Sequence, residues 1–157
     1  MKPNRTIAKK LVITYLVAFA ALAQAKSGEE TFNICLGGEI LSSIEIAPQQ
    51  SITTVKYSGM AKAVPSGGIF DQLGVACHAT ISTVGGPPAS IAHCVYVDKD
   101  GDKYVIRSSA GKSESLGGTG KFTGMKGSGE FKVTRFPAIP GTINVCVDGT
   151  FKYTLPD

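Results

Sequence analysis

The sequence predicts an all-β protein built as a single antiparallel eight-stranded closed barrel, with a β-sandwich as the alternative. Short runs rich in β-branched and aromatic residues recur along residues 26–157, and clusters of Gly, Pro, Asp and Ser separate them. Apolar and polar residues alternate in several runs, and capped helical spacing is absent after residue 25. About eight strands at short spacing in one small domain are typical of a barrel or a sandwich.

The first 25 residues, MKPNRTIAKKLVITYLVAFAALAQA, have the organisation of a secretory signal peptide. Four basic residues precede the uncharged apolar run 11–23, and Ala23-Gln24-Ala25 is a small-x-small cleavage motif. This run is shorter than the roughly 20 residues that span a bilayer as a helix. We therefore expect cleavage before Lys26, a mature domain of residues 26–157, and a secreted or periplasmic location without stable membrane insertion.

Loss of the signal peptide would remove the excess of basic residues. The whole chain has 16 Lys and Arg against 12 Asp and Glu, and four of the basic residues precede Lys26, so the mature domain carries 12 of each. A domain without net positive charge gives no reason to expect nucleic acid as a partner. Four cysteines in an exported domain predict an oxidising compartment and two disulfides.

The expected strands follow one another at short intervals along the chain. The runs with strand composition are 31–36, 39–47, 51–59, 72–83, 90–97, 103–109, 120–125, 129–136 and 142–155. Residues 62–72, KAVPSGGIFDQ, interrupt the pattern and are expected to form a long loop, and GKSES at 111–115 is interpreted as a polar loop. Period-two alternation in the last two runs predicts strands with one solvated face.

The stretch GGTGKFTGMKGSGEF, residues 117–131, is rich in glycine. A nucleotide-binding P-loop would need Ser or Thr where the chain has Phe122, and a dinucleotide fingerprint would need glycine where it has Thr123. Because apolar residues interleave with the glycines, we interpret the stretch as two strongly coiled strands joined at 125–127. Barrel closure requires bends of this kind.

This glycine-rich stretch resembles the hairpin of the allene oxide cyclase and dirigent barrel superfamily. It is most similar to bacterial secreted proteins with an allene-oxide-cyclase-like barrel. DKDGDKYVI, residues 98–106, is similar to the strand–turn–strand that precedes that hairpin. The resemblance covers about a quarter of the chain and implies an eight-stranded antiparallel barrel with a small apolar lumen, often as a homo-oligomer. It places no catalytic residue of the cyclase on this sequence.

Three carboxylates fall within five residues at Asp98, Asp100 and Asp102. An EF-hand loop would continue with glycine and glutamate at the positions of Lys103 and Ser109. We interpret the segment as an Asp-Gly hairpin turn, with a weak ion site as the alternative.

Two mirrored dipeptides, Cys77-His78 and His93-Cys94, flank the turn composition STVGGPPAS. One antiparallel register places Cys77 opposite Cys94 and His78 opposite His93, which predicts a disulfide on one face and a histidine pair on the other. The first strand alternates cleanly with its cysteine on the apolar face, whereas Ile91 and Val95 share a face with His93. We expect the cysteines to point inward and the histidines to lie on the surface, with a metal site at the histidines as the alternative.

Cys35 and Cys146 lie in matching patterns, NICL and NVCV, near the two ends of the mature domain. The first and last strands of a closed barrel are neighbours, so we expect a Cys35–Cys146 disulfide. The two other pairings of four cysteines stay open at this level.

The sequence contains no nucleophile elbow, metal cage or phosphate cradle, and we expect no cofactor. Phe122, Phe131, Phe151 and Tyr153 are the best-phased residues to line or fill the lumen. An eight-stranded barrel has room for side chains or one small ligand. We therefore expect a small apolar molecule to bind in the lumen without being transformed. The alternatives are an isomerase or cyclase that acts in the lumen and an interaction protein of the cell envelope.

Overall fold

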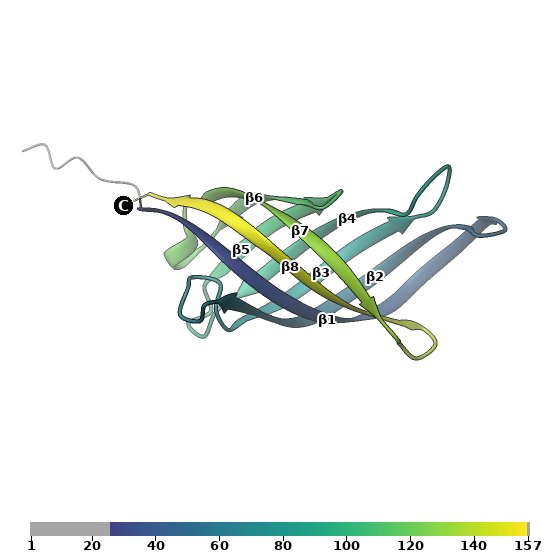
Figure 1. The fold of residues 1–157 in the computed structure, drawn as a ribbon, viewed down its shortest axis with the longest axis horizontal. Helices are drawn as coiled ribbons and strands as arrows, with labels where there is room; N and C mark the ends of the chain where they lie inside the picture. Colours follow the sequence, from purple (N-terminus) through teal and green to yellow (C-terminus); the bar gives the residue numbers. More distant parts are fainter. Residues whose placement is uncertain (1–25, 157) are drawn as a thin grey trace, which may run out of the picture.

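The computed structural model describes residues 26–156, which form a closed barrel of eight strands (Figure 1). The strands are β1 (Lys26–Ala47), β2 (Gln50–Val64), β3 (Leu73–Ser82), β4 (Ala89–Val97), β5 (Lys103–Ser109), β6 (Lys112–Gly118), β7 (Lys126–Phe136) and β8 (Thr142–Leu155), and the 3-10 turn η1 (Gly120–Phe122) separates β6 from β7. The predicted fold class is confirmed as the barrel rather than the sandwich. The signal peptide predicted for 1–25 lies outside the described residues.

Every strand pairs antiparallel with the next one, and β1 also pairs with β8 from Lys26↔Leu155 to Glu39↔Thr142. Because side chains alternate between the two faces of a strand, each strand sends every second side chain into the lumen. The largest fully buried side chains are Val55, Leu73, Tyr104, Phe122 and Met125. The core is therefore the inside of the barrel.

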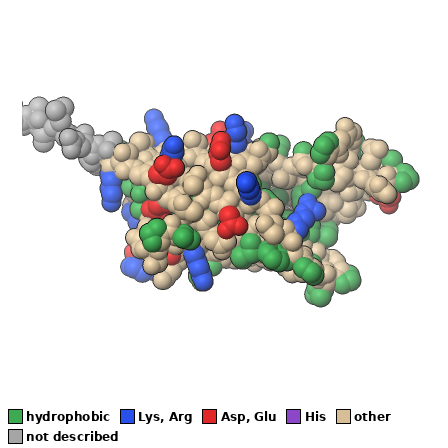
Figure 2. Space-filling model, viewed as in Figure 1, with side chains coloured by type: hydrophobic (Ala, Val, Ile, Leu, Met, Phe, Trp, Pro, Cys, Tyr) green, Lys and Arg blue, Asp and Glu red, His purple; other side chains and the backbone are tan. Residues whose placement is uncertain are grey.

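The two runs expected at 31–36 and 39–47 form one continuous strand, β1. Gly38 does not break it, because a Cβ atom there would lie 2.5 Å from the Tyr57 ring, and glycine lets the ring pack against the backbone. The β1–β2 hairpin projects past the rest of the barrel and exposes Ile44 and Ile46 (Figure 1). On the face in Figure 2, charged side chains of both signs spread over the barrel, and apolar ones are more frequent in the half that carries the β1–β2 hairpin and the β7–β8 turn.

Two expectations about residues 111–125 are wrong. Residues 111–115 are not a loop, because Ala110 and Gly111 make the turn with positive φ and the polar segment after them pairs with β5 as strand β6. Residues 120–125 are not a strand, because η1 and the following turn occupy them. At Gly120, φ is +52° and a Cβ atom would clash with the Asp102 carboxylate, so the chain turns here instead of extending. The expected loop 62–72 is also shorter, since β2 runs to Val64.

The β3–β4 hairpin has the predicted register, with Cys77 opposite Cys94 and His78 opposite His93. A disulfide joins the two cysteines, and both are buried in the core. The histidines lie on the outer surface, as expected. Ile91 of β4 shares the outer face with His93, which from the sequence favoured the opposite orientation. Ile91 lies near the end of that strand and is exposed, so it does not mark the interior.

The second disulfide joins Cys35 of β1 to Cys146 of β8, as expected for neighbouring first and last strands. Cys35 is exposed and Ile34 beside it is buried, so the bridge lies on the outer face of the barrel. This bond therefore joins the first and last strands, whose pairing closes the barrel.

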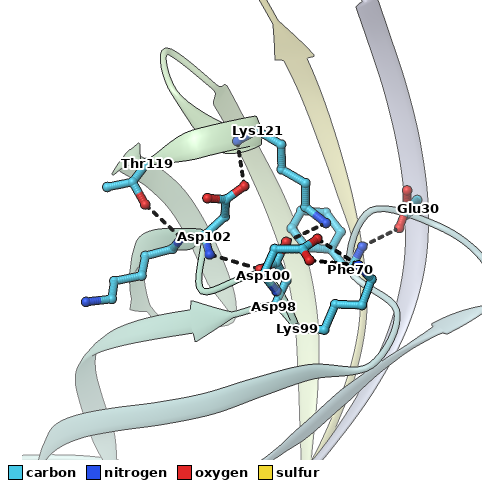
Figure 3. A network of polar contacts seen from close by, with 9 residues as sticks. Glu30, Phe70, Asp98, Lys99, Asp100, Asp102, Thr119 and Lys121 are labelled. Atoms are coloured by element: carbon cyan, nitrogen blue, oxygen red, sulfur yellow. Dashed lines mark hydrogen bonds and ion pairs between the residues drawn. The ribbon is translucent and has the colours of Figure 1, made fainter.

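The segment Asp98–Asp102 forms the β4–β5 turn and organises the chain around it (Figure 3). The Oδ1 atom of Asp98 accepts hydrogen bonds from the backbone N–H groups of Asp100 (2.8 Å) and Asp102 (2.9 Å). Its Oδ2 atom lies 2.9 Å from the Lys121 ammonium, and the Lys121 N–H donates to Asp102 Oδ2. The carboxylates thus hold the turn against η1. Among residues 26–156, no three His, Cys, Asp or Glu side chains group as a metal site.

We predict that replacing both Cys35 and Cys146 by serine lowers the free energy of unfolding by about 4–5 kcal/mol. The two cysteines are 111 residues apart, so the bond removes much of the conformational entropy of the unfolded chain. Urea titration of the purified domain measures the difference. The Cys77→Ala/Cys94→Ala pair, which opens a loop with a separation of only 17, provides the comparison. A loss below about 1 kcal/mol for the first pair would contradict the entropic account.

Asp98 should make the stability of the barrel sensitive to acid. The Lys121 ammonium, together with the N–H donors of Asp102 and Asp100, holds the pKa of the Asp98 carboxyl below its ordinary value of 3.8. A depressed native pKa means that the stabilisation is complete above 3.8 and disappears as the pH falls through the native pKa. The urea midpoint of the wild type should therefore drop in that acid range.

The Asp98→Asn variant should lose part of this acid dependence, whereas Asp100→Asn, a change at an exposed neighbour, should keep it. Urea midpoints measured at a series of pH values give the comparison. Superimposable profiles for the wild type and Asp98→Asn would show that Asp98 does not carry the effect.

Candidate functional site

A cavity of about 810 Å³ occupies the half of the barrel that contains the β3–β4 and β5–β6 turns. Each of the eight strands contributes to its wall. The lining is mainly aliphatic and aromatic, with Phe32, Ile34, Ile106, Phe131 and Val147 among its members. The inward disulfide Cys77–Cys94 forms part of the same wall. A preformed, mostly apolar hollow of this size is typical of small-molecule sites.

The cavity opens where the barrel wall is incomplete. The β5–β6 hairpin is short, so β4 pairs with β5 only from Ile91 onward and β6 pairs with β7 only over residues 128–130. The β7 residues beyond Phe131 therefore have no strand partner on the β6 side. Pro88, Ala110 and Arg135 line the cavity near this gap.

The opposite end of the barrel is filled by aromatic rings around Phe70, which lies in the β2–β3 loop. The Phe70 ring centroid lies 5.4 Å from Phe151, 5.7 Å from Tyr104 and 6.0 Å from Tyr153. Pairs at such distances and tilts add to the gain from burial. The free space left between these rings and the cavity is about 20 Å³. The lumen is thus divided into a filled end and an open end.

A carboxylate holds the loop that carries Phe70. Glu30 of β1 accepts hydrogen bonds from the N–H groups of Ile69 (2.6 Å) and Phe70 (3.1 Å), and Figure 3 shows Glu30 beside this loop. Asp71 accepts from the backbone N–H groups of Ala63 and Gly67. These bonds give an otherwise irregular loop one defined position, which keeps the Phe70 ring inside the barrel.

The four residues expected to line or fill the lumen fall into two groups. Phe131 lines the cavity. Phe122, Phe151 and Tyr153 are buried in the filled end, where Phe122 extends from η1 rather than from a strand. The four residues fall into two groups because only the end of the barrel near η1 is filled. The alternation along the strands did not show which end this is.

Sequence reasoning missed Phe70 and two tyrosines of the core, Tyr96 and Tyr104. Tyr96 could have been found, because it lies two residues after the inward Cys94 and so shares its face. Tyr104 is the second residue of the next strand, β5, and pairs directly with Tyr96. Phe70 gave no signal, because a loop has no periodicity that shows where a side chain points.

The polar groups of the cavity are hydroxyls and one guanidinium. Burial raises the pKa of Tyr57, with the charge of Arg135 opposing the rise, and it raises the pKa of Tyr104 below the cavity to about 12. Both phenols are therefore protonated at neutral pH. Ser113, only 6% exposed, has no hydrogen-bond partner for its hydroxyl within the described part of the chain. Arg135 is the one charged residue in the lining that residues 26–156 provide.

The histidine pair lies away from this cavity, on the outside of β3 and β4. In the sheet register His78 is opposite Lys56, and His93 is opposite Arg107. Two cationic neighbours oppose the binding of a metal cation at this place. Within residues 26–156, no helix has both the length and the apolar character to cross a membrane.

We predict that Phe70→Ala lowers the free energy of unfolding by about 3–5 kcal/mol, because the change leaves a hole among four rings. Phe136→Ala makes the same substitution at a half-exposed position of β7 and should cost much less. Chemical denaturation of both variants tests the difference. Equal losses would mean that the cluster of aromatic rings does not stabilise the filled end.

Comparisons with known proteins support the fold but identify no family. No protein-family model matches the chain, and no curated protein matches it. Among solved structures, the pterocarpan synthase dirigent protein GePTS1 matches with a TM-score of 0.53 and 12% identity, covering 84% of this chain and 88% of its own. The pterocarpan synthase dirigent protein PsPTS1 matches with a TM-score of 0.53 and 13% identity, covering 85% and 97%. This chain therefore has a dirigent-like barrel fold.

Proposed function

We propose that this protein binds a small, largely apolar molecule in the open half of its barrel and does not transform it. The observation that carries the proposal is the cavity of about 810 Å³ with an apolar lining and a gap in the wall for entry. Sites for small molecules commonly measure about 300–1,000 Å³ and place a few polar groups among apolar ones. This cavity meets both criteria, because its lining combines apolar residues such as Phe131 and Cys77 with a few polar ones such as Arg135.

We also propose that the protein works outside the cytoplasm. The two disulfides support this location, because thiols stay reduced in most cytosolic proteins. The signal peptide expected from the sequence of residues 1–25 supports the same location. A binding protein in such a compartment would meet molecules that arrive from outside the cell.

An isomerase or cyclase that acts in the lumen is the alternative, and the two solved neighbours are named as synthases. Chemistry in the cavity would need a group that accepts or donates a proton beside the substrate. Burial raises the pKa of the Tyr57 phenol, so that at neutral pH it is already protonated and is also a weaker proton donor. No carboxylate or imidazole in the described part of the chain lines the cavity. Binding therefore has the stronger support.

The other alternative, an interaction protein of the cell envelope, draws on the exposed apolar side chains of the β1–β2 hairpin. Ile44 and Ile52 pair across this hairpin and both are exposed. Exposed apolar atoms are common on protein surfaces, whereas a preformed apolar hollow of this size is a more specific feature. We therefore place the function in the cavity.

The proposal predicts saturable binding of the neutral probe N-phenyl-1-naphthylamine, which fluoresces strongly in apolar surroundings. Ala79 is a buried residue on the cavity wall, so Ala79→Phe should fill part of the space and weaken the affinity at least about tenfold. Ala76→Phe adds the same ring to the outer face of the same strand, β3, and should leave the affinity unchanged. Fluorescence titration measures all three proteins.

Circular dichroism and urea titration should first show that both variants are folded. If the wild type shows no saturable binding, the proposal fails. Equal weakening by Ala76→Phe and Ala79→Phe would place the probe elsewhere on the protein and would also count against it.

A further inference from the structure

Arg135 lies on the inward face of β7, although most charged residues of this barrel lie outside. Side chains alternate along β7, and the cavity is lined by Phe131, Val133 and Arg135 but not by Lys132. Across the sheet Arg135 pairs with Val145 of β8, which is buried in the core. The strand pairing thus directs the Arg135 side chain toward the mouth of the cavity.

The positive charge of Arg135 has no counter-ion in the described part of the chain. The four ion pairs found there involve other side chains, and no hydrogen bond to Arg135 is present among residues 26–156. Its positive charge lowers the pKa of Tyr57, which lines the same cavity, against the larger rise that burial causes. An arginine that faces an apolar hollow without a carboxylate partner is available to an anion that enters from outside.

The remaining polar groups of the lining suit an anion as well. Ser90 and Ser108, which alternate in phase with the inward residues of β4 and β5, line the cavity near the gap in the wall. Ser113, which is also part of this lining, adds a buried hydroxyl without a hydrogen-bond partner in the described residues. Hydroxyls can donate hydrogen bonds to an anionic oxygen, and a cation would meet no carboxylate in this lining.

We infer that the ligand is an apolar organic acid, whose anionic group lies at the mouth against Arg135 and whose apolar body fills the cavity. This inference rests on the proposed function and specifies its ligand class. Arginine binds carboxylate and sulfonate-like oxygens through two parallel N–H groups, which fixes the orientation of the ligand. The apolar walls then exclude water from the body of the molecule. A neutral molecule of equal shape would gain only the second contribution.

A matched pair of probes separates the two contributions. 8-Anilino-1-naphthalenesulfonate has the same ring skeleton as N-phenyl-1-naphthylamine and adds one sulfonate. We expect the wild type to bind the sulfonate about tenfold more tightly than the neutral probe. Arg135→Gln should remove that advantage and leave the affinity for the neutral probe within about twofold. Arg135→Lys keeps the charge and should retain part of the advantage.

Lys132→Gln is the matched control, since it removes a positive charge from the outward face of the same strand. It should change neither affinity. Ala79→Phe should weaken both probes, which would place both in the cavity. Urea titration of each variant confirms that it is folded, and Arg135 is exposed enough to be replaced without disturbing the core.

The outcomes distinguish this inference from the proposed function. If the two probes bind equally and Arg135→Gln changes neither affinity, the inference is overturned and the proposed function stands. If Lys132→Gln weakens the sulfonate as much as Arg135→Gln does, the attraction is general to the surface and the inference is again overturned. If neither probe binds, the proposed function itself fails.

Discussion

The pairing of β1 with β8 is the constraint on which the rest of this structure depends. It turns a meander of eight antiparallel strands into a tube without free edges over most of its length. Only when the tube is closed do the inward side chains of all strands meet, so that Val55 on β2 and Leu73 on β3 become core residues. The Cys35–Cys146 disulfide lies in this pairing and covalently joins the two strands.

Closure creates a lumen, and the loops at the two ends of the barrel fill it to different extents. At one end a loop held by Glu30 carries Phe70 into the tube, and aromatic rings occupy the space. At the other end the short β5–β6 hairpin leaves the wall incomplete, and the turn residues that line the cavity there, Pro88, Ala110 and Gly111, are small. One barrel thus combines a rigid packed core with a preformed cavity, because different loops supply or withhold the filling side chains.

The charges follow the same division between outside and inside. Pairs such as Arg107 with Glu114 lie on the outer face, where water screens them and each contributes little to stability. The ion pair of Asp98 and Lys121 stabilises the fold, since it holds η1, and with it the buried Phe122, at the filled end. Arg135 differs from both kinds, because the strand alternation directs it inward at the open end. The position of a charge relative to the barrel wall decides its role.

From the sequence alone, the all-β class, the antiparallel register of the β3–β4 hairpin and a favoured pairing of the four cysteines could be predicted, while the structure chose the barrel over the sandwich and established the two disulfides. The predicted features follow from short-range rules: alternation separates two faces of a strand, and the mirrored Cys and His residues fit one antiparallel register. The three-dimensional packing was needed to show which aromatic residues fill one end of the lumen and which line the cavity at the other end. Phe70 comes from a loop, where no periodicity fixes the direction of a side chain, and its place depends on Glu30, which lies far away in the sequence. The polar segment that forms β6 and the turn at η1 likewise depend on partners across the sheet, since pairing with β5 and contact with Asp102 override local composition.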